Sequence, residues 1–175
     1  MNSLRVLVLS SPRGLAAREK VLAQRAAARR ALGELGLEDP LADKEGVPLP
    51  TCGKHWSVSH TEGASAAVLS AERVGIDIEH EREVSVRLLE RFLAAGEPSL
   101  APLAAWTAKE AVLKKTQVGL AGLSECRIAA QTGADTLEIK FQSRVHRVLL
   151  ARHEQWYAAL SCDAPAWRVE WEWRA

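Results

Sequence analysis

The order of helix-forming and strand-forming segments constrains the fold of this chain more than any other feature of its sequence. Apolar residues recur with a period of 3.6 in some segments and a period of two in others, which predicts amphipathic helices and half-buried strands. The first part of the chain is predicted to hold a strand at residues 5–10, a helix at about 15–35, and strands at 55–59, 64–70 and 73–79. A polar loop over residues 36–54 separates this helix from the strands that follow it.

In the second part of the chain, helices again come before a run of strands. Helices are predicted at 84–94 and 102–117, and strands at 126–130, 136–142, 144–150, 155–162 and 167–173. Helices that precede strands in both parts predict an α+β fold of two similar α/β halves, residues 1–74 and 75–175, in one compact unit. With 175 residues the chain is long enough for one domain, or for two small subdomains that share a core.

The last predicted strand has the clearest alternation in the chain. Trp167, Val169, Trp171 and Trp173 fall on one side of it, and charged residues fall on the other. This pattern predicts a half-buried antiparallel strand whose tryptophans belong to the core.

The predicted helix at 15–35 carries a row of arginines beside its apolar face. The apolar face consists of Val21, Ala28, Leu32 and Leu35, and the arginines are Arg18, Arg25 and Arg29. Two interpretations remain open. The arginine stems cover the edge of the core, or their guanidinium groups form an anion-binding stripe at a cleft.

Composition excludes several classes of protein. The chain is 47% apolar and 26% charged, as in an ordinary globular domain, and its net charge of +1 does not favour nucleic acid or an anionic membrane as a partner. No apolar run approaches the length of a membrane span. Three cysteines without a paired spacing favour neither a disulfide framework nor a structural zinc site, and we expect a cytoplasmic protein.

Three short elements carry the residue types that phosphate chemistry requires. In the predicted helix at 102–117, Glu110 and Lys114 are four residues apart and therefore neighbours on one face, with Lys109 beside them. Asp77 and Glu79 are two apart on a predicted strand, so that their carboxylates share a face. Carboxylates held together in this way suit a hard divalent cation such as Mg²⁺ or Mn²⁺.

The third element surrounds a histidine at the end of a predicted strand. His60 lies between Ser59 and Thr61, and its imidazole can donate a hydrogen bond to a phosphate oxygen. Each element also has an ordinary explanation, namely a solvated Glu–Lys helix face, a charged loop that begins at Glu79, and a structural histidine. The sequence lacks the glycine patterns of a nucleotide-binding loop and the nucleophile elbow of a serine hydrolase.

Taken in order, these elements resemble the signature of a known family. Residues 57–61 (SVSHT), 75–79 (GIDIE) and 106–114 (WTAKEAVLK) are similar to the motifs of the Sfp-type 4′-phosphopantetheinyl transferases. The resemblance covers roughly residues 20–120. It implies a pseudo-twofold α/β monomer that moves 4′-phosphopantetheine from coenzyme A to a serine of an apo acyl or peptidyl carrier protein, with release of adenosine 3′,5′-bisphosphate.

The resemblance also implies a role for each site residue. Mg²⁺ would be held by Asp77, Glu79 and Glu110, and Glu110 or a water molecule beside it would take the proton of the carrier serine. Lys114 would neutralise charge on the transferred phosphate. The implied coenzyme A contacts are His60 at the pyrophosphate, Ser59 or Thr61 near the nucleotide, Arg25 near the 3′-phosphate with Arg18 and Arg13 as weaker candidates, and Lys109 as a secondary phosphate contact.

The chain departs from the family pattern around two loops. It is short before residue 20 and between Glu97 and Trp106, and it lacks the lysine that the family often has in the loop before the histidine, where Lys44 is a nearby substitute. The resemblance implies that Glu97 matches an acidic residue of the family. Two other functions remain open, a module that binds coenzyme A or a carrier without transfer, and a metal-dependent phosphohydrolase.

Overall fold

The computed structural model describes residues 2–163 and 167–174, and the chain divides into two compact units. One unit comprises the chain up to Val74 together with the segment from Asp163 onward, and the other comprises Gly75–Cys162. The C-terminal segment therefore belongs with the first half of the chain, although the sequence places it in the second half. The predicted α+β class is confirmed, and the pseudo-twofold relation of two halves stays a prediction.

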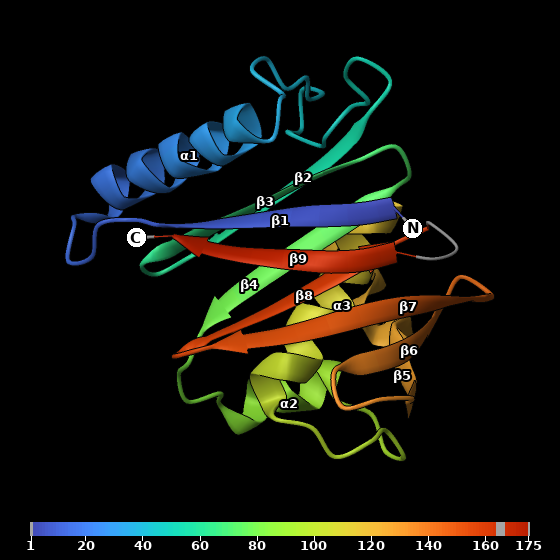
Figure 1. Ribbon diagram of the computed structural model, residues 1–175. Helices are drawn as coiled ribbons and strands as arrows, with labels where there is room; N and C mark the ends of the chain where they lie inside the picture. Colours follow the sequence, from blue (N-terminus) through green and yellow to red (C-terminus); the bar gives the residue numbers. More distant parts are fainter. Residues whose placement is uncertain (1, 164–166, 175) are drawn as a thin grey trace. The chain divides into compact units, whose positions relative to one another are not determined.

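The first unit is a four-stranded sheet with one long helix (Figure 1). Its elements are β1 (Asn2–Ser10), α1 (Ala17–Glu34), β2 (His55–Thr61), β3 (Ala64–Ser70) and β9 (Trp167–Arg174). The strand order is β2-β3-β1-β9, in which β3 runs antiparallel to both β2 and β1. Helix α1 packs against β1, β2 and β3, and this packing forms the core of the unit.

Small residues allow α1 to lie close to its sheet. The buried side chains of the helix are Gln24, Ala27, Ala28, Ala31 and Leu32. Val21 was expected on this face but is 40% exposed, because only the part of the helix from Gln24 onward is buried. The predicted face is therefore correct at Ala28 and Leu32 and wrong at Val21.

Strand β9 runs parallel to β1, with Val6 opposite Trp171 and Val8 opposite Trp173. The prediction of an antiparallel strand was wrong, because alternation reports which side chains share a face and not the direction of the neighbouring strand. Trp171 and Trp173 stack with ring centroids 6.4 Å apart and stay partly exposed, as expected of a half-buried strand.

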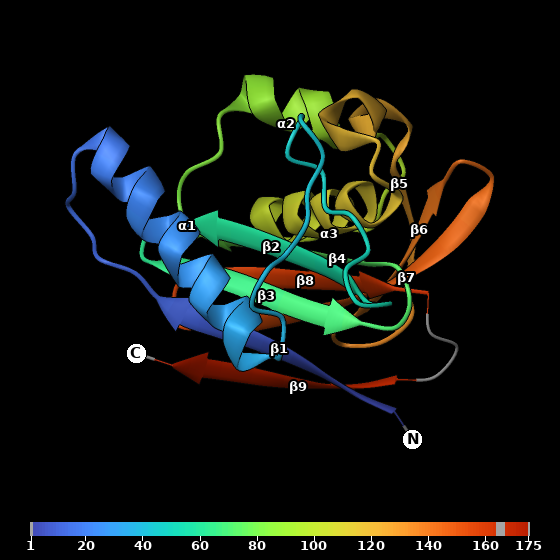
Figure 2. The same ribbon diagram turned by 90° about the horizontal axis from the view of Figure 1, so that it is seen from above.

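The second unit is a five-stranded sheet with helices that pack on it (Figure 2). Its helices are α2 (Val86–Phe92), α3 (Pro102–Thr116) and the 3₁₀ helix η1 (Gly119–Glu125), and its strands are β4 (Val74–His80), β5 (Arg127–Gln131), β6 (Thr136–Phe141), β7 (Arg144–His153) and β8 (Trp156–Cys162). The strand order is β4-β8-β7-β6-β5. Helix α3 packs on β5 to β8, and its buried apolar side chains form part of the hydrophobic core of the unit.

Local capping signals explain where α2 and α3 begin and end. Ser85 caps α2, because its hydroxyl accepts a hydrogen bond from the backbone N–H of Leu88. Pro102 occupies the first turn of α3, where no backbone N–H is needed, and Gln117 ends the helix in the left-handed conformation. The predicted helices at 84–94 and 102–117 are thus confirmed, whereas η1 was not predicted.

Candidate functional site

Strand β4 has one face of apolar side chains in the core and one face that carries acidic side chains. Ile76 and Ile78 are almost fully buried, and Asp77 and Glu79 alternate with them and therefore point to the opposite face. Asp77 is itself buried and Glu79 is partly buried. The strand thus presents two carboxylates side by side, as the sequence predicted.

A glycine allows α3 to approach this strand closely. A Cβ atom added to Gly75 would lie closer than 3.0 Å to the carbonyl oxygen of Ala111 and to the backbone nitrogen of Lys115. Backbone of the strand and backbone of the helix are therefore in direct contact, with no side chain between them. This contact brings the face of α3 that holds Glu110 and Lys114 next to the carboxylates of β4.

An ion pair joins the two elements. The ammonium group of Lys114 donates a hydrogen bond to Oδ1 of Asp77 over 2.7 Å, and the Lys114 side chain is 31% exposed. The other oxygen of the same carboxylate, Oδ2, is buried and accepts no hydrogen bond from the described residues. Lys114 thus neutralises part of the charge on β4 while its side chain stays partly exposed.

Glu110 has the most perturbed carboxyl group of this cluster. Burial is the largest cause that raises its pKa; the charges of Asp77 and Glu79 act in the same direction, Lys114 opposes them, and the resulting pKa is about 7. A carboxyl group with a pKa near neutrality is suited to take up a proton from a substrate at physiological pH.

Glu79 is held from the helix side by an indole. Burial and the charge of Asp77 raise the pKa of Glu79, while Arg82 and a hydrogen bond from the Trp106 side chain lower it. Trp106 also packs edge-on against Phe92, with ring centroids 5.2 Å apart. The sequence does not reveal this contact of Trp106, because it joins a helix and a strand that are far apart along the chain.

The donor set of Asp77, Glu79 and Glu110 suits a hard divalent cation, because all three are carboxylates. Asp77 raises the pKa of both glutamates, and Glu79 raises that of Glu110. A cation between them would relieve this repulsion. Across residues 2–163 and 167–174, however, no three His, Cys, Asp or Glu side chains are gathered closely enough to hold a metal ion as they stand. The chemistry of the three residues fits a divalent cation, and their present positions are not those of a closed cage.

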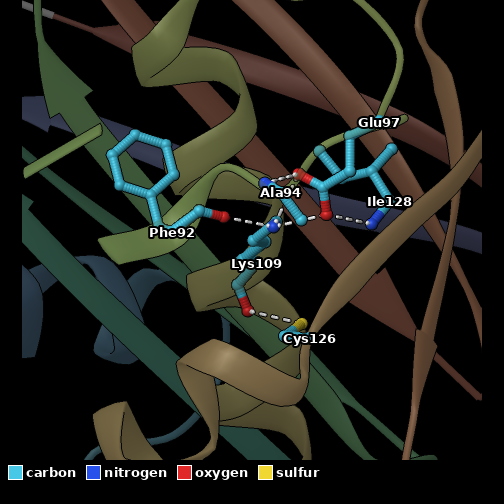
Figure 3. Close-up of polar contacts among 6 residues, drawn as sticks. All are labelled: Phe92, Ala94, Glu97, Lys109, Cys126 and Ile128. Atoms are coloured by element: carbon cyan, nitrogen blue, oxygen red, sulfur yellow. Dashed lines mark hydrogen bonds and ion pairs between the residues drawn. The ribbon is translucent and has the colours of Figure 1, made fainter. Parts of the chain in front are cut away.

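Lys109 lies elsewhere than the sequence suggested. Its side chain is fully buried, and its ammonium group donates hydrogen bonds to Phe92 O and to both carboxylate oxygens of Glu97 (Figure 3). Successive helix residues point about 100° apart, so Lys109 faces the core while Glu110 faces β4. With all three of its N–H groups engaged in the core, Lys109 has a structural place in the fold and not the phosphate contact expected from the sequence.

The first unit contains a pocket between α1 and the sheet. Its volume is about 260 Å³, and its lining includes Arg25, Arg29, Trp56, Val58 and His60. Arg25 and His60, which are far apart in sequence, are therefore brought to one pocket. Arg29 joins them, so two of the three arginines predicted as a stripe lie on a concave surface.

The other predicted contacts of this unit lie outside that lining. Ser59 and Thr61 alternate with His60 along β2, so that their side chains point to the opposite face of the strand. Arg18 is exposed in the first turn of α1, and the Arg13 side chain lies against the backbone of Gly63.

Gln24 in α1 has a clear structural role, whereas Lys44 in the polar loop is a surface residue. Gln24 Nε2 donates to the carbonyl of Thr61 over 2.6 Å, and Ser65 Oγ donates to the carbonyl of Gln24, so the helix is tied to the end of β2. Sequence reasoning missed Gln24, since a glutamine in an apolar stripe carries no functional signal. Lys44 is 88% exposed and pairs with Glu45 at 3.4 Å.

Carboxylates from a strand and a helix, with one lysine beside them on an α+β fold, are of the kind that transferases acting on phosphate groups use. The chain belongs to the 4′-phosphopantetheinyl transferase superfamily, whose family model matches residues 73–161, just over half of its length. The matched range holds β4 and α3 with all four residues of the cluster. Family membership supports a phosphopantetheinyl transferase activity in general terms.

The curated proteins contain no significant match to the chain. None of the helices in the described part of the chain combines the length and the apolar character that crossing a bilayer requires.

Proposed function

We propose that this protein transfers 4′-phosphopantetheine from coenzyme A to a serine hydroxyl of an apo acyl or peptidyl carrier protein in an Mg²⁺-dependent reaction. The observation that carries the proposal is the cluster of Asp77, Glu79, Glu110 and Lys114 on β4 and α3, inside the range that matches the family. The proposal extends the general activity of the family to a defined substrate, product and set of residues.

Asp77, Glu79 and Glu110 would hold the divalent cation. When bound, Mg²⁺ supplies charge neutralisation at the pyrophosphate of coenzyme A. The three residues provide only oxygen ligands, which is the preference of Mg²⁺ and also of Mn²⁺. Lys114 pairs with Asp77 and is partly exposed, so its ammonium group is available to neutralise charge on the transferred phosphate.

Glu110 acts as the base of the proposed reaction. The serine oxygen of the carrier forms a bond to the phosphorus that carries pantetheine, and its proton passes to the Glu110 carboxylate. The bond from that phosphorus to the nucleotide breaks, and adenosine 3′,5′-bisphosphate leaves with the electron pair. Its environment supports this role, because burial and the neighbouring carboxylates raise the pKa of Glu110 to about 7 and make it a stronger base than an exposed carboxylate.

Arg25, Arg29 and His60 would bind phosphate groups at the nucleotide end of coenzyme A. Their pocket has a volume of about 260 Å³, near the lower end of ligand sites. Planar guanidinium groups suit phosphate oxygens, which they bind in pairs. We further propose a monomer that acts in the cytoplasm, in line with cysteines that form no disulfide among the described residues.

The proposal is tested by incubating the full chain with Mg²⁺, coenzyme A and a panel of apo carrier proteins. Intact-mass measurement is expected to find one carrier that gains a single phosphopantetheine group, together with release of adenosine 3′,5′-bisphosphate. Tight binding of coenzyme A without any transfer would contradict the proposal and favour a binding module. Product release in the absence of a carrier would instead indicate a phosphohydrolase.

Arg25→Gln is expected to raise the KM for coenzyme A about tenfold, because a charge-assisted hydrogen bond to the 3′-phosphate is lost. The KM for 3′-dephospho-coenzyme A should not change, since that substrate lacks the group. Arg30→Gln is the matched control, as Arg30 is an exposed arginine of the same helix outside the pocket lining. An equal change in KM for both substrates would show that Arg25 does not contact the 3′-phosphate.

A further inference from the structure

The second unit contains a lysine ammonium group with all of its hydrogens engaged inside the protein (Figure 3). Lys109 Nζ lies 2.7 Å and 2.9 Å from the two carboxylate oxygens of Glu97 and 2.5 Å from the carbonyl oxygen of Phe92. The exposed fraction of the lysine side chain is 0%, and that of the glutamate is 6%. This buried ion pair, which we call the Lys109–Glu97 pair, is complete in itself and has no N–H to offer a substrate.

The carboxylate of the pair connects segments that are distant along the chain. Glu97 accepts hydrogen bonds from the backbone N–H of Ile128, at 2.9 Å, and from that of Ala94, at 3.2 Å. Ile128 lies in β5, and Ala94 follows the end of α2. Four hydrogen bonds to one carboxylate thus fix α3 to β5 and to the segment between α2 and α3.

A second contact holds the same helix residue. The thiol of Cys126 lies 3.9 Å from the carbonyl oxygen of Lys109, just before β5 begins. Burial raises the pKa of Cys126 to about 12, so the thiol keeps its proton and can donate it to that carbonyl. Both the side chain and the backbone of Lys109 are therefore anchored to neighbouring elements.

Because the two residues are adjacent on one helix, anchoring Lys109 fixes the position of the Glu110 side chain. The two residues are adjacent and point about 100° apart, toward the core and toward β4 respectively. A side-chain end lies roughly 6 Å from a helix axis, so a helix rotation of about 20° moves it by about 2 Å. Misplacement of a reacting group by about 1 Å can reduce a rate about 100-fold.

Stability alone does not account for the Lys109–Glu97 pair. Moving two charges out of water costs more than their attraction often returns, and apolar residues of similar size usually serve as well in a core. An ion pair with defined hydrogen bonds instead fixes a single register between the elements that it joins. The pair therefore has the properties of a positioning device.

We infer that the Lys109–Glu97 pair sets the rotation and register of α3 and thereby holds Glu110 beside Asp77 and Glu79. Lys109 and Glu97 are positioning residues, because they act through Glu110 and do not meet the substrate. This inference rests on the proposed function for its effect on catalysis, whereas its effect on Glu110 is independent of that function.

The first test replaces the pair by apolar residues in the full chain, as Glu97→Leu with Lys109→Met. For carrier modification we expect kcat to fall at least about 30-fold, with the KM for coenzyme A changed by less than about threefold. The matched control is Val148→Ala, which weakens the core of the same unit at a fully buried position in β7, a strand that the pair does not join. The control should have a lower melting temperature than the parent and the same kcat.

A gentler variant keeps the test decisive if the double replacement does not fold. Glu97→Gln preserves the size of the side chain and an acceptor for Ile128, and it removes the charge opposite Lys109. We expect kcat to fall about fivefold to tenfold, again with an unchanged KM. An unchanged kcat in a folded pair variant, or in Glu97→Gln, overturns the inference.

The second test needs no activity and uses a double-mutant cycle on melting temperature. Glu110→Gln removes the repulsion that Glu110 feels beside Asp77 and Glu79, so its effect reports whether Glu110 is still held there. We expect that effect to fall below about half in the pair variant, whereas additive effects would overturn the inference. If the parent protein modifies no carrier, the proposed function fails and this cycle alone decides the inference.

Discussion

Replacement of Glu110 by glutamine is expected to lower kcat for carrier modification by at least about 10³-fold, because both a base and a metal ligand are lost. At about pH 8 the same change is expected to raise the melting temperature. The parent protein holds an ionised Glu110 next to Asp77 and Glu79, whose charges raise its pKa in addition to burial. Glutamine removes this charge and keeps the shape of the side chain.

The direction of the stability effect follows from the pKa. The carboxyl group of Glu110 has a pKa of about 7 in the folded protein, against an ordinary value of 4.5. A raised pKa means that its contribution to stability is complete below pH 4.5 and is lost as the pH rises through about 7. The loss is limited to about 3 kcal/mol, and solvent near this partly buried group makes it smaller.

Thermal melting at several pH values, with and without Mg²⁺, measures this effect. Glu110→Gln should melt roughly 2–8 °C above the parent at about pH 8 and close to it at about pH 4.5. Mg²⁺ should raise the melting temperature of the parent more than that of the variant. Glu90→Gln, in the exposed part of α2, is the control and should change neither property. Retention of a tenth of the parental kcat by Glu110→Gln would remove Glu110 from the role of base.

Gly75→Ala is expected to lower kcat at least about 100-fold and the melting temperature by several degrees, because it forces β4 and α3 apart. The new methyl group would meet the carbonyl of Ala111 and the backbone of Lys115, and backbone can give way only if the helix moves. That movement separates Lys114 and Glu110 from Asp77. A loss of kcat is therefore expected even well below the melting temperature, where the protein stays folded.

Gly33→Ala supplies the matched control for this glycine. Gly33 lies inside α1, nothing lies within 4 Å of an added Cβ, and alanine favours a helix over glycine by about 1 kcal/mol. This variant should melt slightly above the parent with the same kcat. Parental activity in Gly75→Ala would show that the close approach of β4 and α3 is not needed for catalysis.

Local patterns predicted the elements of the fold well and the partners of those elements less well. Period and capping signals located α3 and the strand that carries Asp77 and Glu79, because both depend on residues a few positions apart. They did not reveal that β9, although it is the last strand of the chain, pairs with the first strand, β1. Such a pairing joins residues more than a hundred positions apart, and an alternating strand can accept many neighbours.

The candidate site shows the same division within nine residues of α3. Spacing alone places Glu110 and Lys114 on one helix face, and the structure places that face beside β4. Lys109 was also expected to contact a phosphate group. In the structure its side chain lies in the core and forms an ion pair with Glu97. The direction of each helix face is known from sequence, but what lies opposite that face depends on packing.

The sequence by itself determined the α+β class, the acids of β4, the Glu110–Lys114 face and membership in a transferase family, because each of these follows from short-range periodicity or from a motif. Only the tertiary structure decided that the Glu110–Lys114 face lies beside β4, that Gly75 lets two backbones touch, and that Trp106 reaches Glu79. The pKa of Glu110 near 7 belongs to this second group. Burial and charges from another element produce it, and neither exists until the chain has folded.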